Sequence, residues 1–221
     1  MTRADILNRL CGLFPQPSYL EIGVYRGETF LEVQAARKIG VDPNFAFDIK
    51  AAMAAQPHAT LLAMTSDAFF AAPPPTPATY DVIFLDGLHT AEQTLRDLLN
   101  AIELLKPYGV IVLDDILPPS YHAALPGASR SIRLREALHS TDTSWMGDVY
   151  RLAFFIETFL QAFTTATVGG QMLLWRARRP AEALVPRSLE EVGRMPFEET
   201  VFQRGVFNIC PLEEAIRRMG R

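Results

Sequence analysis

The sequence predicts an open, mostly parallel α/β sheet with helices on both faces. Short runs of β-branched and aromatic residues alternate with amphipathic stretches of helical length, as in βαβ units. Two of these runs, residues 82–85 and 110–113, are apolar throughout, which is typical of strands buried on both faces. Glycine or aspartate follows several of the runs, at the edge where parallel sheets bind their ligands.

Length and composition limit the classes of protein that fit. The 221 residues suffice for one domain with an appendage. A hydrophobic fraction of 49% excludes a disordered chain, and a net charge of −4 argues against nucleic acid as a partner. We see no run of about 20 apolar residues that would predict a membrane span, and we expect no signal peptide. The two cysteines, Cys11 and Cys210, fit a reducing compartment, so we expect a cytoplasmic protein.

The first half of the chain alternates between predicted strands and helices. Strands are expected over residues 19–24, 39–42, 59–64 and 81–86, and helices over residues 28–38 and 45–55. The proline-rich stretch 71–79 predicts a loop, because proline removes a backbone donor.

The clearest helix follows the fourth strand. Thr90 can cap it, and Gln93 completes the capping-box pattern. An apolar face at helical spacing is then expected to be buried; its members are Leu95, Leu98, Leu99, Ile102 and Leu105. Residues 106–109 end this helix before the strand at 110–113.

The remaining elements are two helices, a closing hairpin and a tail. Helices are expected over residues 129–139 and 148–160, and a hairpin over 163–168 and 171–177. From residue 180 the pattern weakens into short amphipathic pieces, of which 212–219 is the most helical. We divide the chain into a domain over residues 1–178, with an N-terminal helix, and an extension over 179–221. The extension is either a lid or an oligomer contact, so a homo-oligomer is one of the assemblies that the sequence allows.

The turn after the first strand carries the pattern Glu-x-Gly-x-x-x-Gly, formed by Glu21, Gly23 and Gly27 with Tyr25 between the glycines. Glycine allows a tight turn and a close approach of the backbone to a ligand. The pattern differs from the Gly-x-Gly-x-x-Gly fingerprint, which argues against a nicotinamide-dependent oxidoreductase. A plain strand-to-helix turn is the alternative.

Polar residues also follow the second and third strands. Asp42 can accept hydrogen bonds from two ribose hydroxyls, or it can cap a helix that begins at Pro43. Thr65, Ser66 and Asp67 can face an adenine ring, or they can form a helix N-cap.

Three carboxylates and a histidine follow the fourth and fifth strands. Asp86 precedes His89, and Asp114 and Asp115 end the fifth strand. Clustered carboxylates repel one another, and a divalent cation with a preference for oxygen ligands relieves that repulsion. His89 has a reference pKa that suits a general base near neutral pH. We therefore predict the three carboxylates as metal ligands and His89 as the base. The alternatives are a capping role for Asp115 and a surface position for His89.

Together these segments resemble class I S-adenosylmethionine-dependent methyltransferases. The resemblance covers residues 15–178 and rests on residues 21–27, 41–43 and 81–115. Asp86 with His89, and the Asp114–Asp115 pair, are similar to metal-assisted O-methyltransferases of small molecules, of the catechol and the macrocin or mycinamicin types. Residues 145–151 are similar to a Gly-Asp-Val-Trp-Lys stretch of bacterial relatives.

The resemblance implies a Rossmann-like, doubly wound sheet of seven strands whose last strand is antiparallel. It implies S-adenosylmethionine as cofactor, Mg²⁺ as the metal and a hydroxyl of a small molecule as methyl acceptor. The cofactor-binding residues that it implies are Glu21, Gly23, Tyr25, Gly27, Asp42, Ser66, Asp67 and Asp86. The implied metal ligands are Asp86, Asp114 and Asp115, with His89 as the base.

Two features refine this expectation. N-methyltransferases of this fold often carry an Asn/Asp-Pro-Pro-aromatic motif after the fourth strand, where this chain has residues 86–89, so hydroxyl methylation is favoured. Tyr25 replaces a glycine that many members have. Two alternatives stay open: a metal-free methyltransferase whose Asp114 and Asp115 cap a loop, and a silent domain that binds a cofactor or partner.

Overall fold

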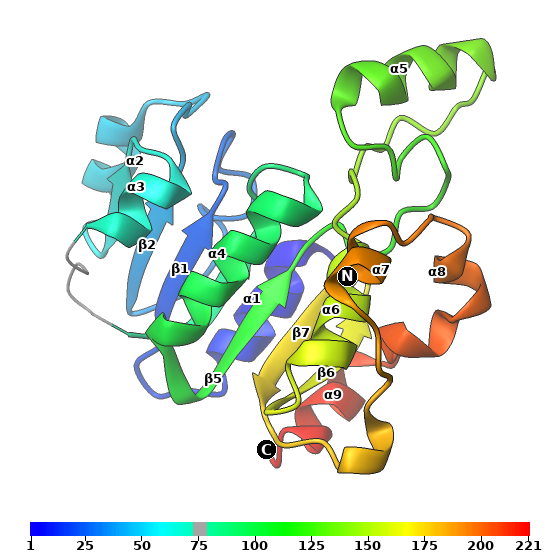
Figure 1. Ribbon diagram of the computed structural model, residues 1–221. Helices are drawn as coiled ribbons and strands as arrows, with labels where there is room; N and C mark the ends of the chain where they lie inside the picture. The colour runs from blue at the N-terminus through cyan, green and yellow to red at the C-terminus, as the bar shows by residue number, and fades with distance from the viewer. Residues whose placement is uncertain (73–78) are drawn as a thin grey trace.

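The computed structural model describes residues 1–72 and 79–221, so most of the proline-rich loop predicted over residues 71–79 lies outside the described residues. Seven strands form one sheet in the order β3-β2-β1-β4-β5-β7-β6 (Figure 1). They are β1 Ser18–Ile22, β2 Arg37–Val41, β3 Ala59–Leu62, β4 Tyr80–Leu85, β5 Leu105–Leu113, β6 Phe163–Val168 and β7 Gln171–Arg176. The first five pair in parallel, whereas β7 is antiparallel to β5 and to β6. The predicted fold class is confirmed.

The sheet reverses its direction of growth between β1 and β4. From β1 the chain moves outward to β2 and β3, and it then returns to place β4 on the other side of β1. The register aligns Ile22 with Val41 and with Leu85, and Leu85 with Leu113. The residues that follow these four strands therefore meet at one edge, at the point where sheets of this kind bind ligands.

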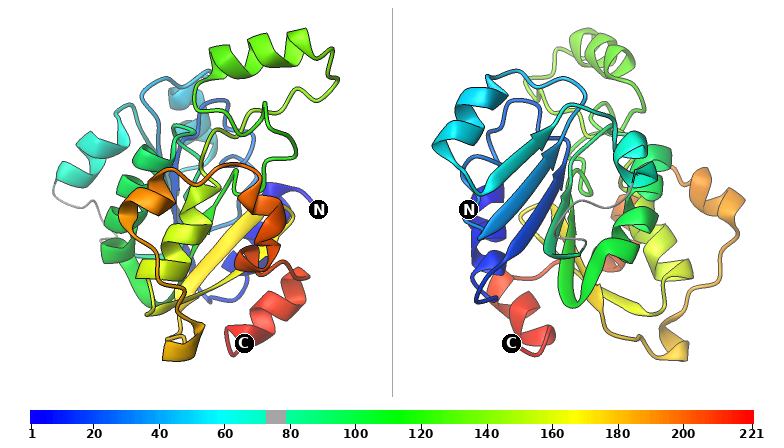
Figure 2. Two further views of the ribbon diagram at one scale, coloured as in Figure 1. Left: turned by 45° about the vertical axis from the view of Figure 1, so that its right-hand side comes forward. Right: turned by 90° about the vertical axis from the view of Figure 1, so that its left-hand side faces the viewer.

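Two helical layers cover the sheet (Figure 1, Figure 2). The helices are α1 Arg3–Cys11, α2 Ile49–Ala55, α3 Ser66–Ala71, α4 Ala91–Leu104, α5 Ala128–Ala137, α6 Arg151–Phe159, α7 Leu189–Gly193, α8 Glu199–Phe202 and α9 Leu212–Arg218, with short 3-10 turns at Ala181–Ala183 and Arg204–Phe207. Apolar residues of α3, α4, α6 and α7 form one core with the sheet, and those of α1, α2 and α9 form the other. Helix α5 projects away from both layers (Figure 1).

The helix predicted over residues 28–38 is wrong. This segment consists of turns, and β2 already begins at Arg37. Side chains from elsewhere bind the carbonyls that a helix would have used. Lys38 Nζ donates to Phe30 O and Val33 O, and Asn8 Nδ2 donates to Glu32 O. These contacts satisfy the backbone without a helix.

Two other local expectations need correction. Helix α2 begins at Ile49 with Asp48 as its cap, later than the predicted start at residue 45. On α4, Thr90 accepts from Gln93 N as expected, but the Gln93 side chain turns toward α3 instead of completing the capping box. Leu99 of the predicted apolar face is 46% exposed.

The tail over residues 179–221 lies along β6 and contributes to both cores. Val192 and Phe207 belong to one core, and Leu212 belongs to the other. Ile209 forms a parallel bridge with Thr167 of β6, whose backbone N–H donates to Asn208 O. Within the described residues, no helix combines the length and the apolar character that a bilayer crossing requires.

Candidate active site

A cavity of about 690 Å³ opens at the carboxyl edge of the sheet, between the ends of β1, β2 and β4. Its walls include most of the residues predicted to bind a cofactor, which are Glu21, Gly23, Tyr25, Asp42, Ser66, Asp67 and Asp86. His89 lines it as well. Gly27, Asp114 and Asp115 are absent from this lining, and among the described residues nothing after Trp145 contributes to it. The volume lies in the range of ordinary small-molecule sites.

The β1 turn is shaped by its two glycines. Gly23 has a φ of +92°, and a Cβ on it would lie 2.0 Å from Asp86 O, so any side chain there would separate β1 from β4. Gly27 has a φ of +76°, and a Cβ there would come within 2.9 Å of the Phe47 ring. Tyr25 also has a positive φ, of 42°. The turn is therefore a constrained structure that presents its backbone to the cavity.

Asp42 fastens the β1 turn to the β2 end. Its Oδ2 accepts from Tyr25 N at 2.8 Å, and its Oδ1 accepts from Asn44 N at 2.7 Å. The capping alternative does not apply, because Asp48 caps the next helix. Each carboxylate oxygen keeps a second lone pair for a further donor.

The sequence offered two roles for residues 65–67, a helix N-cap and a position facing an adenine ring. Thr65 caps α3 through Ala68 N, whereas Ser66 and Asp67 line the cavity. Gln93 Nε2 donates to Ser66 Oγ at 3.2 Å and to Asp67 Oδ1 at 3.1 Å. Gln93 thus joins α4 to this wall.

Glu21 is buried beneath the cavity floor. Tyr19 Oη donates to its Oε2 at 2.5 Å. Burial raises the pKa of Glu21 to about 8, against the opposing effects of Tyr19 and Lys38. A bound cation over this carboxyl would favour its ionised form.

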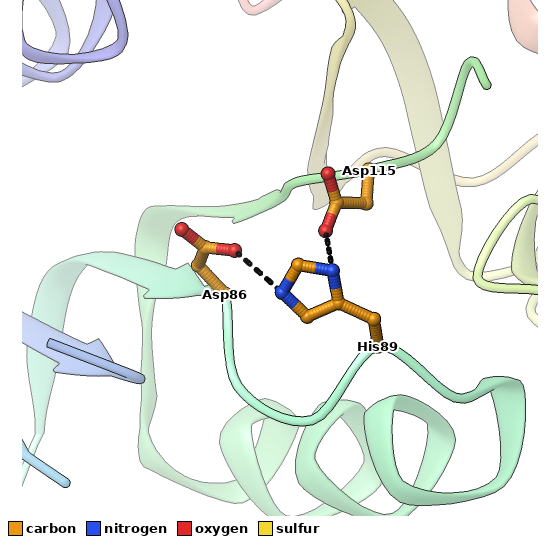
Figure 3. Close-up of side chains that lie close together, drawn as sticks. All are labelled: Asp86, His89 and Asp115. Atoms are coloured by element: carbon orange, nitrogen blue, oxygen red, sulfur yellow. Dashed lines mark ion pairs between the residues drawn. The ribbon is translucent and has the colours of Figure 1, made fainter. Parts of the chain in front are cut away.

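His89 lies between two carboxylates (Figure 3). Its Nδ1 is 2.8 Å from Asp115 Oδ2 and 3.0 Å from Trp145 O, which are both acceptors. Nδ1 therefore carries the proton, and Nε2 keeps the lone pair in the neutral ring. Nε2 lies 3.8 Å from Asp86 Oδ1, and both residues line the cavity.

The pairing with Asp115 changes the acidity of His89. Burial disfavours the imidazolium, but the hydrogen bond and the charge of Asp115 outweigh it and raise the pKa of His89 above its usual value. Asp115 itself has a φ of 58°, an uncommon conformation for a residue with a side chain. The left-handed turn after β5 thus directs this carboxylate toward the imidazole.

The segment 145–148 holds the His89 turn from the other side. The Trp145 ring stacks on the imidazole with centroids 4.8 Å apart. Gly147 has a φ of +63°, and a Cβ on it would lie 1.7 Å from His89 O. Asp148 Oδ1 accepts from Ala91 N at the start of α4. These contacts fix the imidazole with little freedom to rotate.

Asp114 points to a different partner. Its Oδ1 accepts from Gln171 Nε2 at 2.9 Å, and its Oδ2 lies 2.5 Å from Arg3 Nε as an ion pair. Arg3 Nη1 also approaches Asp86 Oδ2 at 3.5 Å. Among the residues that the structure describes, the side chains within ligand-forming distance of one another are Asp86, His89 and Asp115. Asp114 Oδ2 is buried and accepts no hydrogen bond, so the ion pair with Arg3 is its polar contact. The arrangement does not fit a cation held jointly by Asp86, Asp114 and Asp115, because the Arg3 guanidinium pairs with two of the three carboxylates.

Three contributors to the site were missed from the sequence. Gln93 was noted only as a capping residue, and Trp145 only as part of a resemblance. Arg3 carries no local signal, because its role depends on where α1 packs.

Comparisons with known proteins agree with this architecture. Residues 20–116 match the family model of a methyltransferase domain. The cofactor-bound protein Rv0187 from MTB superimposes with a TM-score of 0.57 and 16% identity, over 80% of each chain. The O-methyltransferase TomG from Streptomyces achromogenes, involved in tomaymycin synthesis and solved with SAM, gives a TM-score of 0.52 and 18% identity over 79% of each chain.

An O-methyltransferase from Bacillus cereus in complex with SAH gives a TM-score of 0.53 and 14% identity, over 79% of this chain and 80% of that one. This is the class I methyltransferase fold. No curated protein matches the sequence. The match to the methyltransferase model runs from β1 to just beyond β5, so it includes Glu21, Asp42, His89 and Asp115 but neither Arg3 nor Trp145.

Proposed function

We propose that the protein transfers the methyl group of S-adenosylmethionine to a hydroxyl oxygen of a small molecule, with His89 as general base. One observation carries the proposal: two acceptors hold His89 Nδ1, so Nε2 is the basic nitrogen, and His89 lines the same cavity as the cofactor-binding turn. The methyltransferase domain supports the reaction class, and the O-methyltransferases among the similar structures support oxygen as the acceptor atom.

The cofactor residues keep their predicted roles in this proposal. When bound, S-adenosylmethionine supplies an activated methyl group on its sulfonium. Glu21 beneath the floor offers a carboxylate to the amino-acid end, and the backbone of the Gly23 turn lies against it. Asp42 uses its remaining lone pairs for the ribose hydroxyls. Ser66 and Asp67, braced by Gln93, border the adenine.

The chain has two tasks in the chemical step. It positions the hydroxyl of the acceptor in line with the methyl group, which supplies much of the acceleration. His89 Nε2 accepts the hydroxyl proton, and Asp115 stabilises the imidazolium that results. The proposal assigns the proton transfer to His89 and gives no role to a cation shared by Asp86, Asp114 and Asp115, because Gln171 and Arg3 pair with Asp114.

Calorimetric titration of the purified protein with S-adenosylhomocysteine tests the cofactor assignment, with NADH as the control ligand. We expect saturable binding of S-adenosylhomocysteine at one site and none of NADH. Glu21→Gln should weaken this binding, whereas the same change at Glu103, which is exposed on α4 and lies outside the cavity, should not.

A panel of phenols, sugars and amines, assayed for release of S-adenosylhomocysteine, then tests the acceptor class. Turnover with amines alone would contradict oxygen methylation. Binding of NADH in place of S-adenosylhomocysteine would contradict the whole proposal.

A further inference from the structure

The guanidinium of Arg3 lies against two carboxylates that follow different strands. Its Nε is 2.5 Å from Asp114 Oδ2, and its Nη1 is 3.5 Å from Asp86 Oδ2. The Asp114 and Asp86 side chains are only 3% and 15% exposed, whereas Arg3 reaches them from the solvent side. A single side chain of α1 therefore joins the ends of β4 and β5.

The position of Arg3 is fixed by the helix that carries it. Thr2 and Asp5 form a complete capping box around the first turn of α1. Ile6, Leu7 and Leu10 are buried in the core on the α1 side of the sheet. Because α1 is anchored at both its first turn and its apolar face, Arg3 is held at the wall of the cavity.

Three carboxylates meet at this edge of the sheet, those of Asp86, Asp114 and Asp115. Like charges at short range repel one another, and a positive charge among them relieves that repulsion. The Asp114 oxygen that does not face Arg3 is satisfied by Gln171. Arg3 is thus the cation in direct contact with Asp86 and Asp114.

We infer that Arg3 is the resident cation of this acidic site and takes the place that the sequence assigns to a divalent metal ion. The inference rests on the proposed function. Arg3 is a positioning residue: it pairs with Asp86 and Asp114 and holds both side chains in place, and Asp86 lies 3.8 Å from the base His89. Methyl transfer then requires no divalent cation, and α1 is part of the active site although it lies outside the methyltransferase domain at residues 20–116.

Titration with Mn²⁺, followed by electron paramagnetic resonance of the free ion, tests this directly. We expect no binding to the wild-type protein at millimolar Mn²⁺. Arg3→Met removes the charge but keeps an apolar stem, and it should bind one Mn²⁺ with a dissociation constant of about 0.1–1 mM, as carboxylate sites of low affinity do. Arg3→Lys keeps the charge and should exclude the ion.

Arg9→Met is the matched control. Arg9 lies on the same helix but pairs with Glu213 of α9, away from the cavity. It should behave as the wild type in the Mn²⁺ titration and in turnover.

Turnover gives the second measurement. EDTA should leave wild-type kcat unchanged, and Arg3→Met should lower kcat by about 10- to 100-fold, as misplacement of a catalytic group does. Arg3→Lys should restore part of it. If Arg3→Met does not fold by circular dichroism, Arg3→Gln, which also removes the charge, replaces it and should bind Mn²⁺ in the same way.

Stoichiometric Mn²⁺ binding by the wild type, or loss of its turnover in EDTA, would overturn the inference. So would an Arg3→Met protein that neither binds Mn²⁺ nor loses turnover. A wild type that fails to bind S-adenosylhomocysteine would instead refute the proposed function, while the Mn²⁺ comparison would still decide the role of Arg3.

Discussion

At the scale of single residues, the chemistry depends on which nitrogen of His89 is free. Asp115 and Trp145 O both accept from Nδ1, so only Nε2 can take a proton from an acceptor. We expect His89→Ala to lower kcat by about 10²- to 10⁴-fold, the usual contribution of a general base. The affinity for S-adenosylhomocysteine should stay within measurement error. A variant with full turnover would contradict the assignment of the base.

Because the pKa of His89 is raised, assigning it as the base predicts how kcat changes with pH. Below that pKa the imidazolium has no lone pair on Nε2, so kcat should rise with pH through the raised pKa. Asp115→Asn removes the charge that favours the imidazolium and should move the rising limb of the profile to lower pH, with a lower plateau because the base is weaker. A limb that moves to higher pH, or does not move, would show that Asp115 does not act on His89.

At the scale of elements, the site depends on the contact between the β4–α4 turn and segment 145–148. Gly147→Ala would place a Cβ 1.7 Å from His89 O at a φ of +63°. We expect it to lower kcat strongly, because the imidazole shifts, and to leave S-adenosylhomocysteine binding nearly intact. Gly170→Ala is the control: it carries a similar strain, at a φ of +95°, but meets nothing within 4 Å. Its melting temperature should fall while kcat stays constant. Equal effects of both variants on kcat would contradict a specific role of this contact.

The elements also mark the limit of prediction from sequence. The strands and the residues that follow them carry local signals, so the fold and most of the cavity wall were predictable. The turns over residues 28–36 were not, because Asn8 binds Glu32 O from α1, and Lys38 binds Phe30 O and Val33 O from its place in β2. The grouping of Asp86 with Asp115 and His89, while Asp114 pairs with Arg3, is likewise a consequence of packing between distant segments.

At the scale of the whole molecule, the two ends of the chain meet on one side of the sheet. Arg9 of α1 forms a bidentate pair with Glu213 of α9, and Leu212 and Ile216 share a core with Ile6 and Leu7. The ion pair itself is exposed to solvent and contributes little to stability. The shared core is therefore what positions α1, and through it Arg3, at the cavity.

The bridge between Ile209 and Thr167 has a consequence for solubility. Strand β6 ends the sheet order, and an uncovered end strand offers its backbone groups to other chains. Truncation after Cys210 removes α9 but keeps the bridge, whereas truncation after Phe207 removes both. Light scattering during refolding should therefore rise much more for the shorter chain, and equal scattering would contradict a protective role. By covering part of the edge strand β6, the tail then hinders β-pairing between copies of the chain, and this effect does not depend on any ligand.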